Sequence, residues 1–427
     1  MILWLYFFSY FLVAGGIAYW LTPIIRQWSI KCKALDLPSQ RKPHEKAIPT
    51  MGGIAMYFAF FVTVLIASAG HSFWIGQPLF PDFKIHHLFL GVTPIVIVGM
   101  IDDKYHINYK WKLVVQIGVA ILMLQFGYQI YAVTNPFNGD SIPLGFLSKP
   151  LTILWFLFII NAINFIDGID GLAAGISLIA LLTTFVVSLY LNNIQVAMLA
   201  AILSGSIVGF FRYNFYPASI FMGDTGSLFL GFSIALLSLR SAQKSSTAVA
   251  LAIPIVILGL PIADAIGAVI RRWSSGWVGS HTLPDRALSW TKIFHPDLGH
   301  IHHRLLALGL TRPQVVVLLY LVAIGFGATG LALVAARYQQ IALILLYMGI
   351  VFFIAFRKFP TLSEPFPAHK PTFQPTIESV PHFLETKAKD PSFIGSRKFS
   401  RLVLWIAGVS LPIFIFIIVV FGKGFFR

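Results

Sequence analysis

The sequence predicts an all-α, polytopic integral membrane protein with about 11–12 transmembrane helices. Of its 427 residues, 57% are hydrophobic and 11% are charged, whereas soluble domains carry about 25% charged residues. The mean hydropathy is +0.81, and apolar runs of about 20 residues, long enough to cross a bilayer as a helix, recur along the chain. A soluble protein with a very large core is therefore disfavoured.

Reading from the N-terminus, we expect apolar spans separated by mostly short loops. Their approximate limits are residues 2–25, 48–70, 86–101, 113–133, 149–163, 170–191, 195–211, 221–239, 247–270, 313–336, 340–356 and 401–422. The first run lacks the preceding basic residues and the cleavage site of a signal peptide, so we expect it to remain as a span. Its first positive charge, Arg26, follows the span, which predicts an N-terminus on the outside.

The distribution of charge supports this orientation. Most of the 31 Lys and Arg residues then fall on the inner side, in or beside segments 26–47, 102–112, 164–169, 212–220, 271–312 and 357–400. Positive residues concentrate in cytoplasmic loops, so we expect these segments, and any active site formed by their polar motifs, to lie at the cytoplasmic face of a plasma membrane. The net charge of +15 then indicates anionic substrates or lipids, and we expect no nucleic-acid partner.

The chain divides into parts of different composition. Residues 1–356 are expected to form the membrane domain, and residues 357–400 a flexible cytoplasmic linker rich in Pro, Ser, Thr and charge. Residues 401–427 would add a last transmembrane helix. No internal repeat is apparent in the sequence, which counts against inverted-repeat transporters.

The most informative motif follows the span at 149–163. It places Asn161, Asn164, Asp167 and Asp170 at three-residue spacing. Ionisable groups at the end of a span indicate function because they are costly there, and carboxylate and amide oxygens suit a hard cation such as Mg²⁺. In an ideal helix this spacing turns the side chains by about 60° per step. We therefore expect the helix to break near Gly168, or the four residues to have different roles.

Two further acidic motifs stand at the inner ends of spans. Asp102 and Asp103 end the third span, and adjacent residues do not share a helix face, so one can face a substrate while the other binds backbone or a basic neighbour. Asp224 opens the eighth span between Gly223 and Gly226, where a helix N-terminus favours anions. An ordinary helix cap would explain either acidic motif alone.

The longest inner loop carries a histidine-rich motif with His300, His302, His303 and Arg304. These side chains can bind phosphate or donate protons. Zinc is the rival interpretation, but no cysteine is nearby in the sequence and the acidic groups elsewhere suit a harder ion.

Two weaker features complete the set. Lys46 and the glycine pair at 52–53 offer a cation and a turn at the membrane surface. Asp264 lies inside the ninth span, with Arg271, Arg272 or a residue of a neighbouring span as its expected partner.

Together and in this order, these motifs resemble the polyprenyl-phosphate N-acetylhexosamine-1-phosphate transferases of glycosyltransferase family 4. The matching stretches are P-T-M-G-G at 49–53, the Asp pair at 102–103, N-A-I-N-F-I-D-G-I-D-G-L at 161–172, R-Y-N-F-Y-P-A-S-I-F-M-G-D-T-G-S-L at 212–228 and G-H-I-H-H-R at 299–304. The H-I-H-H-R form is similar to the N-acetylglucosamine branch, whereas the muramoyl-pentapeptide branch typically has three consecutive His followed by an aromatic residue and an acid. The insert at 281–297 and the twelfth span depart from the family pattern.

The resemblance implies transfer of a sugar-1-phosphate, in the favoured reading N-acetylglucosamine-1-phosphate, from a UDP-sugar to undecaprenyl or another polyprenyl phosphate, with release of UMP. This is the first membrane step of cell-envelope polysaccharide synthesis, such as that of lipopolysaccharide or teichoic acid. Mg²⁺, or Mn²⁺ in its place, is the implied cofactor, and a homodimer is a family-level expectation. Two alternatives stay open: a phospho-N-acetylmuramoyl-pentapeptide transferase of peptidoglycan synthesis, and a Mg²⁺ or anion transporter. A transporter would place polar residues near span centres, whereas here they collect at inner ends.

The resemblance also implies roles for individual residues. The implied Mg²⁺ ligands are Asn164 and Asp224. The implied catalytic residues are Asp102, Asp103, Asp167, His302 and His303. The implied substrate-binding residues are Lys46, Asp170, Asn214, Phe221, His300 and Arg304, with Asp170, Asn214 and Phe221 contacting uridine.

Overall fold

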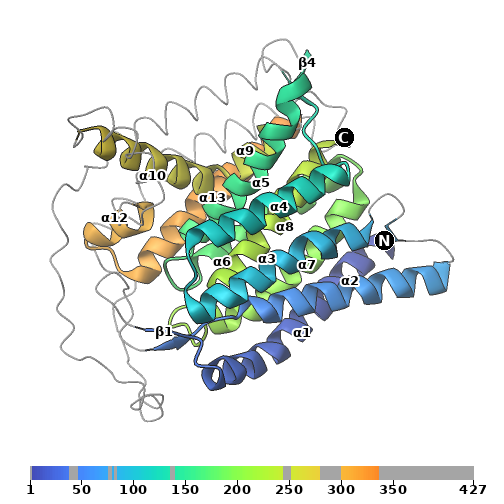
Figure 1. The fold of residues 1–427 in the computed structure, drawn as a ribbon. Coiled ribbons are helices and arrows are strands. Elements are labelled where there is room, and N and C mark those ends of the chain that lie inside the picture. Colours follow the sequence, from blue (N-terminus) through green and yellow to red (C-terminus); the bar gives the residue numbers. More distant parts are fainter. Residues whose placement is uncertain are drawn as a thin grey trace.

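The computed structural model describes residues 2–37, 47–75, 79–80, 84–134, 140–243, 252–278 and 300–335. This part of the chain is a bundle of long helices with two short antiparallel strand pairs (Figure 1). Seven of its helices are long and apolar enough to cross a membrane. The prediction of an all-α polytopic membrane protein is confirmed.

The elements follow the expected spans closely. The helices are α1 (Ile2–Lys31), α2 (Gly53–Ile75), α3 (Ile85–Tyr105), α4 (Tyr109–Gln125), α5 (Ser148–Ile166), α6 (Leu172–Tyr190), α7 (Ile194–Asn214), α8 (Gly223–Gln243), α9 (Ala252–Ile257), α10 (Gly259–Val278), α12 (Ile301–Ala307) and α13 (Arg312–Ala335). The strand pairs are β1 (Leu35–Asp36) with β2 (Ile48–Pro49) and β3 (Ala132–Thr134) with β4 (Ser141–Pro143), and a 3₁₀ turn, η1 (Gly145–Leu147), precedes α5.

Three expected spans differ from the structure. The span expected from residue 48 begins as a helix only at Gly53, because residues 48–49 pair as strand β2 with β1. The span expected at 247–270 is split into α9 and α10, and Gly259 at the split lies so close to the Phe326 ring that a Cβ there would come within 2.4 Å. The expected span at 113–133 ends as helix α4 at Gln125. The expected spans at 340–356 and 401–422, and the linker at 357–400, lie outside the described residues.

Tight turns bring the motif-bearing helix ends together. His106 follows α3 with a φ of 50°, and the Asn108 side chain caps α4 by accepting a hydrogen bond from the Lys110 N–H. Gly171, with a φ of 76°, opens α6. The turns 106–108, 167–171 and 215–222 therefore lie at one end of the bundle, on the left in Figure 1, with β1 and α12. We call this the polar end; the β3–β4 hairpin lies at the other end.

Helix α8 lies in the interior of the bundle, against α2, α3, α5 and α6. Its Phe229 and Phe232 side chains are fully buried. Because surrounding helices rather than lipid cover α8, it tolerates a more polar sequence than the seven apolar helices. Its first residues, including Asp224, are thereby held in the middle of the polar end.

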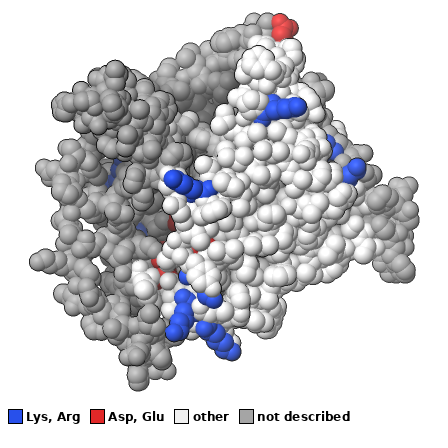
Figure 2. Space-filling view, in the orientation of Figure 1, with Lys and Arg blue, Asp and Glu red and all other residues white. Residues whose placement is uncertain are grey.

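The outer surface is largely apolar. Figure 2 shows a broad face with few charges, and acidic atoms are visible in a hollow at its edge. Large hydrophobic side chains such as Trp20, Ile97 and Val114 are 75%, 50% and 59% exposed. Such a surface is suited to contact with lipid acyl chains.

Candidate active site

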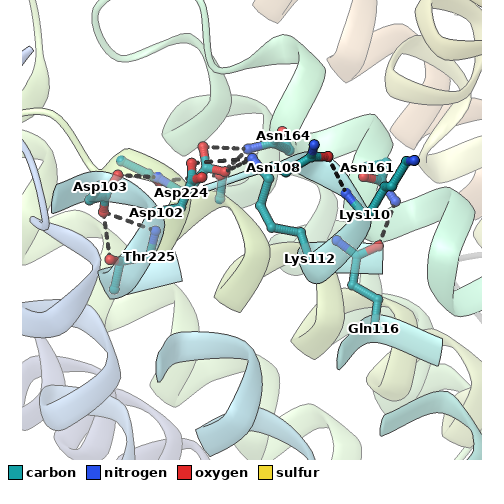
Figure 3. Close-up of polar contacts among 12 residues, drawn as sticks. Asp102, Asp103, Asn108, Lys110, Lys112, Gln116, Asn161, Asn164, Asp224 and Thr225 are labelled. Carbon is teal, nitrogen blue, oxygen red and sulfur yellow. Dashed lines mark hydrogen bonds and ion pairs between the residues drawn. The ribbon is translucent and has the colours of Figure 1, made fainter. Parts of the chain in front are cut away.

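Helices α3, α4, α5 and α8 bring four polar side chains together at the polar end (Figure 3). Lys112 Nζ lies 2.8 Å from Asp224 Oδ2 and 3.2 Å from Asp102 Oδ2. Asn164 Nδ2 donates a hydrogen bond of 3.0 Å to Asp224 Oδ1. We call Asp102, Lys112, Asn164 and Asp224 the Asp224 cluster. Asp102 Oδ1 is buried and has no hydrogen-bond partner among the described residues, so it can accept one from a bound molecule.

Asp103 lies behind this cluster and caps α8. Its carboxylate accepts hydrogen bonds from the Asp224 N–H at 2.8 Å, the Thr225 N–H at 3.1 Å and the Thr225 hydroxyl at 2.5 Å. Gly223 has a φ of 67°, and a Cβ there would collide with the Asp103 carboxylate. The adjacent carboxylates therefore have different surroundings, as expected for neighbouring helix positions. Asp103 contacts the α8 backbone, and its catalytic role stays a prediction.

The chain breaks from helical structure within the three-residue ladder. Helix α5 ends at Ile166 and α6 begins at Leu172, so the expected break near Gly168 is present. Asn164 joins the Asp224 cluster, whereas Asp170 Oδ2 accepts a 2.9 Å hydrogen bond from the Ala218 N–H in the α7–α8 loop. The ladder residues therefore contact different parts of the site.

Asp167 is the ladder member that lies at the end of α5. It follows α5 directly, and its N–H donates to the Asn164 carbonyl. Burial, with the added negative charges of Asp224 and Asp103, raises the pKa of the Asp167 carboxyl well above its usual range. A raised pKa favours the neutral, protonated form of this carboxyl.

The α7–α8 loop is held by backbone pairing. Asn214 Nδ2 donates to the Ile220 carbonyl at 3.1 Å, while its buried Oδ1 has no partner in the described part of the chain. The Phe221 N–H donates to the Pro49 carbonyl at 2.8 Å, and the Phe221 carbonyl accepts from the Gly52 N–H at 2.9 Å.

The P-T-M-G-G stretch at 49–53 thus braces the start of α8. The Gly53 N–H donates to the Met222 carbonyl, and a Cβ on Gly53 would lie 2.2 Å from the Gly226 nitrogen. The glycines of this motif allow close backbone approach. The cation expected beside it, Lys46, lies outside the described residues.

The histidine motif packs over the break between α5 and α6. His300 Nδ1 lies 2.8 Å from Asp264 Oδ2, and Asp264 Oδ1 accepts from the Ile301 N–H at 2.8 Å. The partner that the structure gives Asp264 is thus not a residue of a neighbouring span, as expected, but His300 in the segment before α12. The side chains of Arg271 and Arg272, the other expected partners, lie outside the described part of the chain. One carboxylate both contacts His300 and accepts from the first N–H of α12.

His302 and Arg304 are largely buried in the same motif. His302 is 2% exposed and Arg304 is 8% exposed, while His303 is half-buried. His302 lies against Gly168, and its Nε2 has no hydrogen-bond partner within the described ranges. Burial beside His303 lowers the pKa of His302 to about 3. His302 is therefore a neutral hydrogen-bonding group at physiological pH, and Arg304 supplies a positive charge.

Several contributing residues were not among the predicted site residues. Lys112 stands at the start of the expected span at 113–133, where a lysine ordinarily marks the cytoplasmic border. The sequence feature that could have indicated Lys112 is the short turn after Asp102 and Asp103. Such a turn brings the start of the next helix back beside those two carboxylates. Thr225 contacts Asp103 and Ser227 contacts Asn164 through their hydroxyl groups. Ser and Thr are common at helix N-termini, so their presence here did not indicate a site.

The donor set fits a hard cation better than zinc. Among the described residues, no group of three or more His, Cys, Asp or Glu side chains has the arrangement of a metal site. The Asp224 cluster nevertheless offers two carboxylates and an amide, with the Ser227 hydroxyl 2.8 Å from Asn164 Nδ2. Mg²⁺ usually binds through one or two carboxylates together with substrate phosphates, which these residues can satisfy.

Comparison with known proteins gives consistent matches. The family model described as glycosyl transferase family 4 matches residues 85–242, which run from α3 to α8. The chain is 39% identical over 332 residues to the probable undecaprenyl-phosphate N-acetylglucosaminyl 1-phosphate transferase of Bacillus subtilis, covering 78% of this chain and 86% of that protein. It is 31% identical over 346 residues to the decaprenyl-phosphate N-acetylglucosaminephosphotransferase of Mycolicibacterium smegmatis, covering 74% and 80%. A phospho-N-acetylmuramoyl-pentapeptide-transferase of Caldicellulosiruptor bescii is 30% identical over 311 residues, covering 69% and 87%.

Proposed function

Because the chain belongs to glycosyltransferase family 4, we propose that it transfers N-acetylglucosamine-1-phosphate from UDP-N-acetylglucosamine to undecaprenyl or another polyprenyl phosphate and releases UMP. The observation that carries this proposal is the 39% identity to an N-acetylglucosaminyl 1-phosphate transferase across 86% of that protein. The H-I-H-H-R form of the histidine motif favours the same sugar over the muramoyl-pentapeptide.

The charge of the site matches the charge of the reactants. Both substrates are anions, so their approach requires positive charge, which Lys112 and Arg304 can supply. A phosphate monoester has its second pKa near about 6, so the lipid phosphate is largely dianionic at neutral pH and needs little help from a base. Asp102, with its unpartnered buried oxygen, would orient the acceptor or remove its residual proton.

Direct displacement follows from this charge state. An oxygen of the lipid phosphate attacks the β-phosphorus, the bond between that phosphorus and the bridging oxygen breaks, and UMP leaves with that oxygen. Mg²⁺ is the proposed cofactor, and when bound it would neutralise diphosphate charge. Asp224 and Asn164 are the residues proposed to hold it, and the Asp103 cap fixes the backbone that carries Asp224.

Orientation completes the proposal. We place the polar end at the cytoplasmic face of the plasma membrane and the N-terminus outside, since Lys31, Lys104, Lys110 and Arg212 lie at the helix ends there. The lipid acceptor then reaches the Asp224 cluster from the bilayer. A homodimer stays a prediction from the family resemblance.

The test is Mg²⁺-dependent UMP release from UDP-N-acetylglucosamine and polyprenyl phosphate by the purified protein. Asp224→Asn should lower kcat by about 100-fold or more because a carboxylate proposed to hold Mg²⁺ is lost, and Asp102→Asn should do so because the group proposed to orient or deprotonate the acceptor is lost. Asp140→Asn, the same change at an exposed position beyond the far end of the helices, is the control. Unchanged activity in both site variants would contradict the site assignment.

Two further measurements separate the alternatives. Replacing the donor with UDP-N-acetylmuramoyl-pentapeptide decides between the two branches of the family. Release of UMP before any lipid is added, with a radiolabelled phospho-enzyme, would contradict direct displacement and establish a covalent route.

A further inference from the structure

A pair of amides joins α4 to α5 one turn below the Asp224 cluster. Asn161 Nδ2 donates hydrogen bonds to Gln116 Oε1 at 2.8 Å and to the Leu157 carbonyl at 2.7 Å (Figure 3). Gln116 is 2% exposed within an otherwise apolar stretch of α4. A buried amide there is costly without a partner, so the two side chains stabilise one relative position of the helices.

This pair is in register with two members of the Asp224 cluster. Gln116 follows Lys112 by four residues and Asn161 precedes Asn164 by three, so each amide is a helical neighbour of one cluster residue. Lys112 and Asn164 contact opposite oxygens of Asp224, at 2.8 Å and 3.0 Å. Helices α4 and α5 are thus connected in two layers, directly through the amides and, one turn closer to the polar end, through Asp224.

We propose that Gln116 and Asn161 are positioning residues, which set the place of the Lys112 ammonium group relative to Asn164 and Asp224. The inference rests on the proposed function and adds residues that act through Lys112 rather than on the substrate. The first turn of α4 contains the exposed residues Tyr109, Lys110 and Trp111, so packing alone restrains it weakly. The amide pair connects α4 to α5 one helical turn from Lys112.

A second polar junction, between α5 and the chain that follows α4, tests whether the amide pair positions Lys112 or only holds α4 and α5 together. At the far end, Gln129 Nε2 donates to Ser148 Oγ at 2.6 Å, and the Ile130 N–H donates to Thr152 Oγ1 at 2.9 Å. This junction also holds the chain after α4 against α5, but it is remote from the Asp224 cluster. If the amide pair only holds the two segments together, changes at either junction should have the same effect on kcat.

The experiment compares the activity of single variants at the two junctions with that of a double variant in which Gln116 and Asn161 are exchanged. Gln116→Asn shortens the side chain by one methylene and breaks the link while keeping the polarity. The double variant Gln116→Asn with Asn161→Gln restores the summed length of the pair. Gln129→Asn is the matched control at the far junction. The readouts are kcat, KM for the UDP-sugar and the midpoint of thermal unfolding of the purified full chain.

Gln116→Asn should lower kcat by about 10- to 100-fold, because misplacing a charged group by about 1 Å is costly for catalysis. KM should change less than kcat, the swap should recover most of the lost activity, and Gln129→Asn should keep wild-type kcat. Equal kcat in Gln116→Asn and Gln129→Asn, or a stable swap that stays as inactive as the single variant, would overturn positioning. An inactive wild type would instead contradict the proposed function and this inference with it.

Discussion

At the scale of single residues, identical side chains in this site make different contacts because their surroundings differ. Asp102 and Asp103 are adjacent, yet one carboxylate lies beside Lys112 while the other accepts three hydrogen bonds at the start of α8. The ladder behaves in the same way, since Asn161 binds Gln116 and Asn164 binds Asp224. Residue type alone therefore does not give the role.

The two neighbouring aspartates should respond differently to the same substitution. In Asp103→Asn, the side-chain amide can no longer accept from both backbone N–H groups of α8, so the cap is weakened by about 0.5–2 kcal/mol. We expect this variant to lower both the midpoint of thermal unfolding and kcat. Asp102→Asn should lower kcat with an unchanged midpoint. Equal midpoints in the two variants would contradict the capping role.

His302 should make stability depend on acid pH. Its folded pKa is about 3, below the ordinary histidine value of about 6.5, so the unfolded chain binds more protons between these values. Stability therefore falls as pH drops below about 6.5, by about 2 kcal/mol at pH 5 from this group. Thermal unfolding at pH 7 and pH 5 should show a smaller acid loss in His302→Gln than in the wild type, and equal losses would count against the buried neutral imidazole.

At the scale of elements, the site is assembled by helices that are distant in sequence. The backbone of 49–53 pairs with that of 221–222, α12 is capped by Asp264 of α10, and α13 contacts the α5–α6 break. In the last contact, the Tyr320 hydroxyl donates a 2.6 Å hydrogen bond to the carbonyl of Gly171. The turn that carries Asp167 and Asp170 is thereby fixed from a helix outside the matched family range.

Tyr320→Phe tests that contact without changing the shape of the ring. Loss of one hydrogen bond worth about 0.5–1.5 kcal/mol should raise KM for the UDP-sugar by about 2- to 10-fold, because the Asp170 turn is less well held. Tyr57→Phe removes a comparable bond between α2 and α3, to Thr93 at 2.9 Å, and should leave KM within about twofold of wild type. Similar KM values for the two variants would exclude a role of Tyr320 at the turn.

At the scale of the whole molecule, the apolar bundle places every described motif at the polar end. Polar groups that would be costly in lipid are thus collected at one end of the bundle rather than along its apolar length. The same arrangement leaves the apolar outer surface for the bilayer, from which a lipid acceptor arrives (Figure 2).

Labelling of introduced cysteines tests the proposed orientation. After Cys32→Ser, one cysteine would replace Lys110 in the first turn of α4, which is exposed. In a second variant it would replace Phe146 near the β3–β4 hairpin, which is 86% exposed. A membrane-impermeant maleimide should label the Phe146→Cys variant in intact cells, and the Lys110→Cys variant only after the membrane is opened. The reverse pattern would show that the N-terminus and the polar end are exchanged.

The sequence by itself determined the membrane class, the approximate positions of most of the described helices and the motifs of the site, because apolar run length and polar residues at span ends are local signals. The break near Gly168 was predictable in the same way, from the mismatch between a three-residue spacing and the helical repeat.

Only the tertiary structure decided which polar groups meet. The Lys112 link between Asp102 and Asp224, the Asp103 cap on α8 and the Gln116–Asn161 pair each depend on the rotation of one helix against another. Side-chain packing among many helices sets that rotation. The residues that determine this packing are spread over the whole chain and do not form a motif.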